Sequence, residues 1–292
     1  MAAGQRIGAR DLLTHVAGGP FVLVVGILTV SAVIGYLAAV RRVGAPAGRW
    51  PLGRTAAFVA GAFGAWVSVG SGVAVYSMTS LTLHIVRHVI LMMTVPALIS
   101  LGRPVTLLRA SGIPGAARLL DTASRSRVLG AATHPVPVWF IYLASMYLML
   151  ADRPFFAYMM AHPMVQDSGT VSMVVIGLLY WGMLVASGET RRGPSYPARV
   201  ISILANMPFE VLAGIWLRYQ MRPMDPMYTL GDTRAAGEAF IVGATLISTV
   251  WLVAVVVQWL AAAWREENAG PKATGDSPGW TVPWWVESVS EA

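Results

Sequence analysis

Residues 81–101 read LTLHIVRHVILMMTVPALISL, an apolar run in which one arginine and two histidines are the only ionisable side chains. The run is as long as the stretch that an α-helix needs to cross the hydrocarbon core of a bilayer. A helix satisfies its own backbone hydrogen bonds, so it can lie in lipid without water. The stretch therefore predicts a transmembrane helix that carries polar groups inside the membrane.

The rest of the chain is also rich in apolar residues and poor in charged ones. Of its 292 residues, 56% are hydrophobic and 12% are charged, whereas soluble domains average about 25% charged residues. Six further apolar runs are long enough to span a bilayer, the fourth run of the chain only barely. These runs are 20–40, 55–76, 135–151, 169–188, 198–217 and 237–263. We expect an all-α, polytopic membrane protein with about seven transmembrane helices in one bundle.

The basic residues predict how the chain is oriented. Most of them lie in the loops after the first, third and fifth runs and in the C-terminal tail. Cytoplasmic loops retain arginine and lysine, so we expect the N-terminus outside and the C-terminus inside. We further expect one membrane domain at 1–267, an amphipathic stretch at 116–128 on the inner surface, and a flexible cytoplasmic tail at 268–292. That tail contains Trp280, Trp284 and Trp285.

Composition also limits the function. The net charge of +7 fits the basic cytoplasmic loops of a membrane protein, so we expect no nucleic-acid partner. The chain has no cysteine, which excludes thiolate metal sites and thiol nucleophiles. No nucleophile–base pair and no cofactor motif is visible, so the sequence does not indicate an enzyme.

Ionisable side chains inside spans are costly and are functional hypotheses by default. Arg87 and Glu210 are the two charged residues that clearly qualify, and we expect them to face the bundle interior in contact or one water apart. His84 and His88 share a helical face with Arg87, at spacings of three and four residues. Such a histidine pair can bind one metal ion, and it can equally be a polar stripe that hydrogen-bonds between helices.

Methionines collect in the loops expected outside. Thioether and imidazole ligands suit Cu(I), although flexible methionine also fills packing gaps without binding metal. Met78, near the turn before the third span, is a further thioether that could complete or feed such a site. The candidate metal ligands are His84, His88, His162, Met221, Met224 and Met227.

Residues 83–107, LHIVRHVILMMTVPALISLGRPVTL, combine the histidine pair, an apolar run to Pro96, and a Leu-Gly-x-Pro turn at 101–104. This segment resembles the signature of the bacterial caa-type cytochrome c oxidase assembly factor family, CtaG of the Bacillus type. Further matches follow in order at His134 and Pro135, at Gly177, Tyr180 and Trp181, at Tyr196, Pro197 and Arg199, and at Met207, Pro208 and Phe209.

The resemblance implies a seven-helix protein of the bacterial plasma membrane that helps to assemble heme-copper oxidase through copper delivery. Its partners would be lipid and oxidase subunits. The family usually has further histidines where this chain has Gln166, Thr170 or Ser172, and Glu210. Two other functions therefore stay open: a structural or accessory subunit of a larger membrane complex that binds no metal, and a small-solute or ion transporter with Arg87 and Glu210 in its path.

Overall fold

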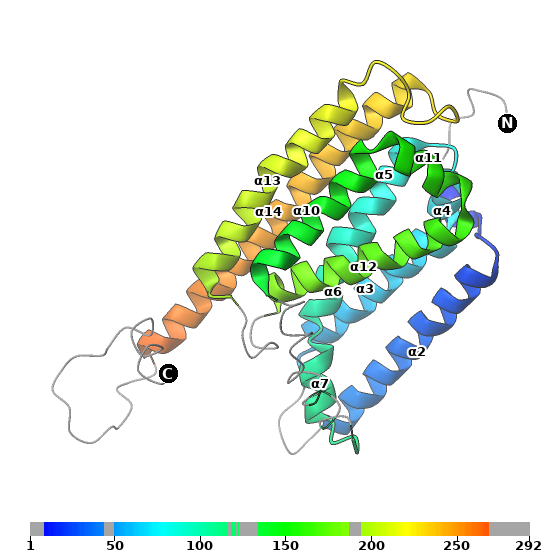
Figure 1. Ribbon diagram of the computed structural model, residues 1–292. Coiled ribbons are helices and arrows are strands. Elements are labelled where there is room, and N and C mark those ends of the chain that lie inside the picture. Colours follow the sequence, from blue (N-terminus) through cyan, green and yellow to red (C-terminus); the bar gives the residue numbers. More distant parts are fainter. Residues whose placement is uncertain are drawn as a thin grey trace, which may run out of the picture. The chain divides into compact units, whose positions relative to one another are not determined.

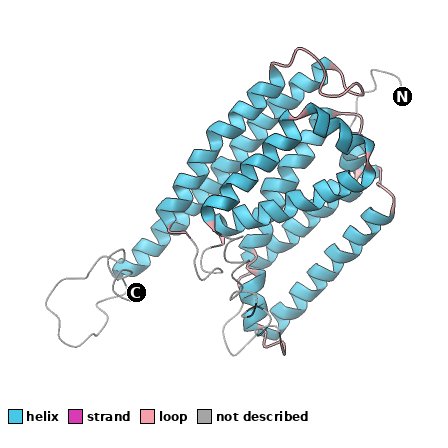
Figure 2. Ribbon diagram, in the orientation of Figure 1, coloured by secondary structure: helices cyan, strands magenta, loops and turns pink. Residues whose placement is uncertain are grey.

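The computed structural model describes residues 9–43, 50–115, 118, 120, 122, 134–186 and 194–268 (Figures 1 and 2). In these residues the regular structure is helical, and the one β-type pairing is an isolated bridge between Val16 and Ser71. The amphipathic stretch expected at 116–128 lies almost wholly outside the described residues, and the tryptophans of the tail lie outside them altogether.

The described chain folds as a succession of helices joined by short turns and loops. Their bounds are α1 Ala9–Thr14, α2 Pro20–Val43, α3 Leu52–Gly70, α4 Gly72–Ser77, α5 Leu81–Val89, the π-helix η1 Ile90–Thr94, α6 Val95–Leu101, α7 Pro104–Ala110, α10 Pro135–Ala151, α11 Arg153–Ala161, α12 Pro163–Val185, α13 Tyr196–Arg218 and α14 Leu230–Asn268. Residues up to Val255 form one compact unit, and residues from Val256 form a second, of which the structure describes the last turns of α14.

The helices confirm the expected polytopic all-α architecture. Six stretches are long and apolar enough to cross a membrane, or seven if α10 and α11, bent by 76° at their junction, count as one span. The helices α12 and α14 begin at Pro163 and Leu230, several residues before the apolar runs predicted at 169 and 237. Polar residues in these first turns lower the hydropathy without preventing helix formation, so hydropathy alone placed both starts too late.

The third span is not a uniform α-helix. It changes to a π-helix at Ile90–Thr94 and returns to an α-helix at Val95. Pro96 explains the change, because proline has no N–H to donate to the carbonyl four residues earlier, that of Met92. Gly177 of α12 packs directly on this carbonyl: a Cβ at Gly177 would lie 2.5 Å from the Met92 oxygen. The widened turn is therefore held against a neighbouring helix.

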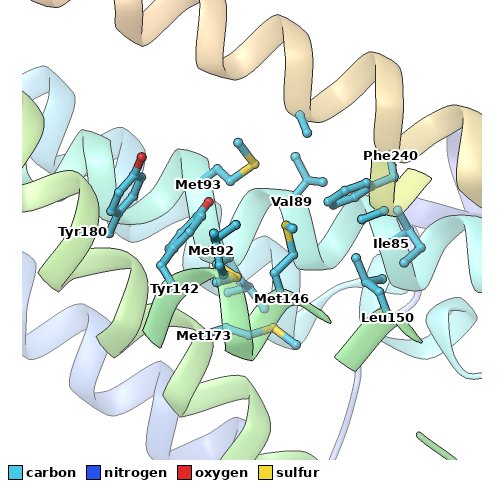
Figure 3. Close-up of a cluster of buried hydrophobic side chains, with 14 of the residues drawn as sticks. Ile85, Val89, Met92, Met93, Tyr142, Met146, Leu150, Met173, Tyr180 and Phe240 are labelled. Atoms are coloured by element: carbon cyan, nitrogen blue, oxygen red, sulfur yellow. The ribbon is translucent and has the colours of Figure 1, made fainter. Parts of the chain in front are cut away.

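The larger buried core of the first unit lies around the third span, α10, α12 and α14. Figure 3 shows Ile85, Val89 and Met92 of the third span together with Tyr142 and Met146 of α10. In contrast, α2 presents most of its apolar side chains outward. Exposed apolar area on this scale requires a covering apolar phase, which lipid provides for a membrane helix.

Several chain junctions meet at one end of this unit, which we call the α11 end. The Tyr228 hydroxyl donates to the Ser77 carbonyl at 3.3 Å, and Asp232 accepts from the first residues of α5. Arg153, at the start of α11, donates to Gln220. Burial raises the pKa of Tyr228, so its hydroxyl stays a neutral donor at this junction. These contacts join α4 and α11 to the segment between α13 and α14, and they join α5 to the first turn of α14.

Candidate functional site: the polar residues of the third span

His84 and His88 lie on one face of α5, as their spacing predicts, and both are buried. The His84 ring contacts Phe156 of α11 edge-on, with ring centroids 5.4 Å apart. The His88 ring contacts Phe240 of α14 in the same way, at 6.4 Å. The pair therefore lies between α5, α11 and α14, in aromatic surroundings near the α11 end.

Each of these imidazoles has a buried nitrogen without a hydrogen-bond partner. In His84 the atom is Nδ1, and in His88 it is Nε2. Buried polar atoms are nearly always hydrogen-bonded, so two such atoms on one helical face need an explanation. A neutral imidazole nitrogen with a free lone pair is a metal ligand. Met92, the next residue at a spacing of four, is also buried, and it adds a thioether to the donors of this span.

Arg87 contacts two other helices beside α5, namely α3 and α12. Its Nε donates to the Ser68 carbonyl of α3 at 2.7 Å, and its Nη2 donates to the Thr170 hydroxyl of α12 at 3.0 Å. Ser68 lies in the last turn of α3, where carbonyls lack partners within the helix. A cation is favourable at such a C-terminus. Arg87 therefore closes the end of α3 and links it to α12.

Glu210 has a different set of partners. Asn206 of the same helix donates to it at 2.5 Å, and Ser248 of α14 donates at 2.9 Å. Among the described residues the structure forms no ion pair between Arg87 and Glu210, which corrects the contact expected from the sequence. The reason is the rotation of α5: Val89, about 200° around the helix from Arg87, is the residue that lies near Gly243 of α14.

The remaining candidate ligands do not converge on the histidine pair. His162 is exposed at the junction of α11 and α12, and its Nδ1 lies 2.7 Å from the Tyr158 carbonyl. Of the three methionines between α13 and α14, Met221 and Met227 are exposed whereas Met224 is buried. Within the described residues, no group of three or more histidine, cysteine, aspartate or glutamate side chains could hold a metal ion. The arrangement thus offers two imidazoles, together with the thioether of Met92 in the same span.

Two further contacts of the first unit were not anticipated from the sequence. The Gln166 amide lies 3.1 Å from the Met78 sulfur and 3.8 Å from the Met160 sulfur, which brings these two thioethers to one side chain. Asp232 caps α5 across the bundle, through the backbone N–H groups of Leu81 and Thr82. The position of Asp232 ahead of an apolar run was the one sequence signal that could have indicated a capping residue. No sequence pattern indicates that the helix it caps is α5.

Comparison with known proteins agrees with the resemblance of the third span. The profile of the cytochrome c oxidase caa3 assembly factor family matches residues 34–262. Uncharacterized proteins of Mycobacterium bovis and Mycobacterium tuberculosis are each 33% identical over 204 residues, which are 66% of this chain and 30% of theirs. One of Mycobacterium leprae is 31% identical over 192 residues, 63% of this chain and 29% of its own.

The chain thus spans less than a third of the length of these curated relatives. No solved structure gives a significant match. The family profile nevertheless covers most of the chain, including all of the third span, α10, α12 and α13. The chain therefore belongs to the cytochrome c oxidase caa3 assembly factor family.

Proposed function

We propose that this protein assists the assembly of a heme-copper respiratory oxidase in the bacterial plasma membrane, and that Cu(I) is the cargo it handles on the extracytoplasmic side. Membership of the assembly factor family supports the assembly role. The observation that carries the copper role is the pair of buried, unpartnered nitrogens of His84 and His88. Imidazole and thioether donors suit Cu(I), and the chain has no cysteine to compete for it.

The proposed role requires the site to bind Cu(I) reversibly and to catalyse no reaction. Two imidazoles and one thioether from a single span offer fewer donors than a closed structural metal site, which has four. A small donor set favours exchange of the ion over storage. The aromatic rings of Phe156 and Phe240 pack beside the pair and would limit the access of water to it. Copper would thus be held long enough to be passed on, and no bond in a substrate would be changed.

The test is elemental analysis of the full chain, purified without chelator after growth in copper. We expect copper in the wild-type protein and its loss when His84 and His88 are both replaced by alanine. A second double variant with glutamine at both positions keeps polar side chains there, in case alanine disturbs folding. His134→Ala is the matched control, because His134 is exposed at the start of α10 and should not affect the copper content.

A second function has its own support. Since the described residues hold no group of three or more hard or imidazole ligands, the chain can instead be an accessory subunit that binds no metal. The same preparations decide between the two. If the wild-type protein and both double variants purify without copper and restore oxidase assembly equally in a deletion strain, the copper role is wrong and the accessory role stands.

A further inference from the structure

Glu210 is a carboxyl group held deep in the first unit, and it is 1% exposed. It lies eight residues before Arg218, where α13 ends, which is about 12 Å at the rise of an α-helix. Within a bilayer this depth is hydrocarbon rather than water. An isolated carboxylate in such surroundings is so costly that the group normally becomes neutral instead.

The part of the chain that the structure describes places no cation where it could compensate a charge at this position. The hydrogen-bond donors to Glu210 are the amide of Asn206 and the hydroxyl of Ser248, both neutral. The phenols of Tyr142 on α10 and Tyr180 on α12 are the titratable groups of the described residues that interact electrostatically with it. Among the described residues, no arginine, lysine or histidine lies within ion-pair distance of this carboxyl. A neutral acid therefore fits the surroundings better than an ion.

Asn206 provides the missing acceptor. It is 1% exposed, and its Oδ1 has no hydrogen-bond partner. The two ends of an amide have the same shape, so the side chain turned by 180° would place Oδ1 against Glu210. The two side chains are 2.5 Å apart at that contact, a separation that an O–H···O bond allows. In that orientation a protonated Glu210 would donate to the Asn206 Oδ1, and the Asn206 Nδ2 would take the buried position that Oδ1 now holds without a partner.

We propose that Glu210 is a proton-binding site at the contact of α13 with α14, where it is held as a neutral acid that donates to Asn206 and accepts from Ser248. Loading needs only a proton from water, which forms the O–H bond at the carboxyl; nothing is oxidised or reduced. The helices approach closely beside it, because a Cβ at Gly237 would lie 2.7 Å from the Gly214 carbonyl. Loss of the proton would place an unpaired charge in this tight contact.

The test is infrared spectroscopy of the full chain in lipid at neutral pH. We expect the carbonyl stretch of a protonated carboxylic acid, shifted in heavy water and absent from the Glu210→Gln spectrum. Glu238→Gln is the matched control, since Glu238 is exposed and paired with Arg218, and it should lose a carboxylate band instead. Asn206→Ala should shift the acid band to higher frequency by removing its acceptor.

Two results would overturn the proposal. One is that Glu210→Gln removes a carboxylate band and leaves the acid region unchanged. The other is that exchange of potassium for sodium abolishes the acid band, which would make the oxygen cluster a sodium site. Glutamine is isosteric with the neutral acid, so the variant should fold; a circular dichroism spectrum equal to that of the wild type verifies this. Neither result depends on copper or on oxidase assembly.

Discussion

The carboxylate of Asp232 accepts hydrogen bonds from Thr82 at two atoms, the hydroxyl at 2.7 Å and the backbone N–H at 3.2 Å. It also accepts from the N–H of Leu81 at 2.5 Å. These are N–H groups of the first turn of α5, which have no partner within their own helix. The first turn of α14 thus caps α5 across 150 residues of sequence and fixes its rotation just before His84.

Replacing Asp232 by alanine should lower the free energy of unfolding by about 1.5–3 kcal/mol, the usual range for hydrogen bonds to a charged group. The unfolding midpoint in detergent measures this effect. Asp225→Ala is the control, because Asp225 accepts one N–H, that of Met227, in an exposed turn. Equal midpoints for the two variants would show that the cap contributes nothing beyond a local turn.

Gly177 and Gly243 should respond in opposite ways to the same added methyl group. A Cβ at Gly177 would lie 2.5 Å from the Met92 carbonyl oxygen, whereas a Cβ at Gly243 would lie 3.7 Å from Val89. Gly177→Ala should therefore destabilise by about 1–3 kcal/mol through overpacking. Gly243→Ala should be neutral or stabilise by up to about 1 kcal/mol, because alanine is the better helix former. Thermal unfolding of both variants tests the packing of α12 on η1.

Arg87 should behave as a structural link between three helices. Arg87→Leu leaves the Ser68 carbonyl and the Thr170 hydroxyl without their donor, and we expect a loss of about 1.5–3 kcal/mol. Thr170→Val removes one of the two contacts and should cost about 0.5–1.5 kcal/mol. If Arg87→Leu matches the wild type in stability but abolishes transport of a solute, the transporter function gains support and this role is refuted.

The orientation of the chain stays a prediction of its basic residues. Fusion of a reporter that is active only in the cytoplasm should give activity at the C-terminus and none at the N-terminus. The complementary reporter, active only outside, should give the reverse pattern. Activity of the outside reporter at the C-terminus would invert the topology and place the α11 end, with its histidine pair, on the cytoplasmic side.

Much of the fold follows from the length of the apolar runs. Helices form at all seven predicted runs, and the short fourth run is the one that meets a second helix, α11, at a sharp bend. The predicted start of α14 is too late because Asp232 and Arg234 lower the hydropathy of its first turns. These side chains reach the surface or other helices, so they cost the helix little.

The sequence by itself determined that the chain is helical, that it suits a membrane, and that His84 and His88 share one face. These properties depend on composition and on spacing within one helix, which neighbouring helices do not alter. Only the tertiary structure decided that Arg87 contacts Ser68 and Thr170 while Glu210 contacts Asn206 and Ser248. The physical reason is that partners depend on how each helix is rotated about its axis, and packing at close contacts such as Gly177 on Met92 sets that rotation.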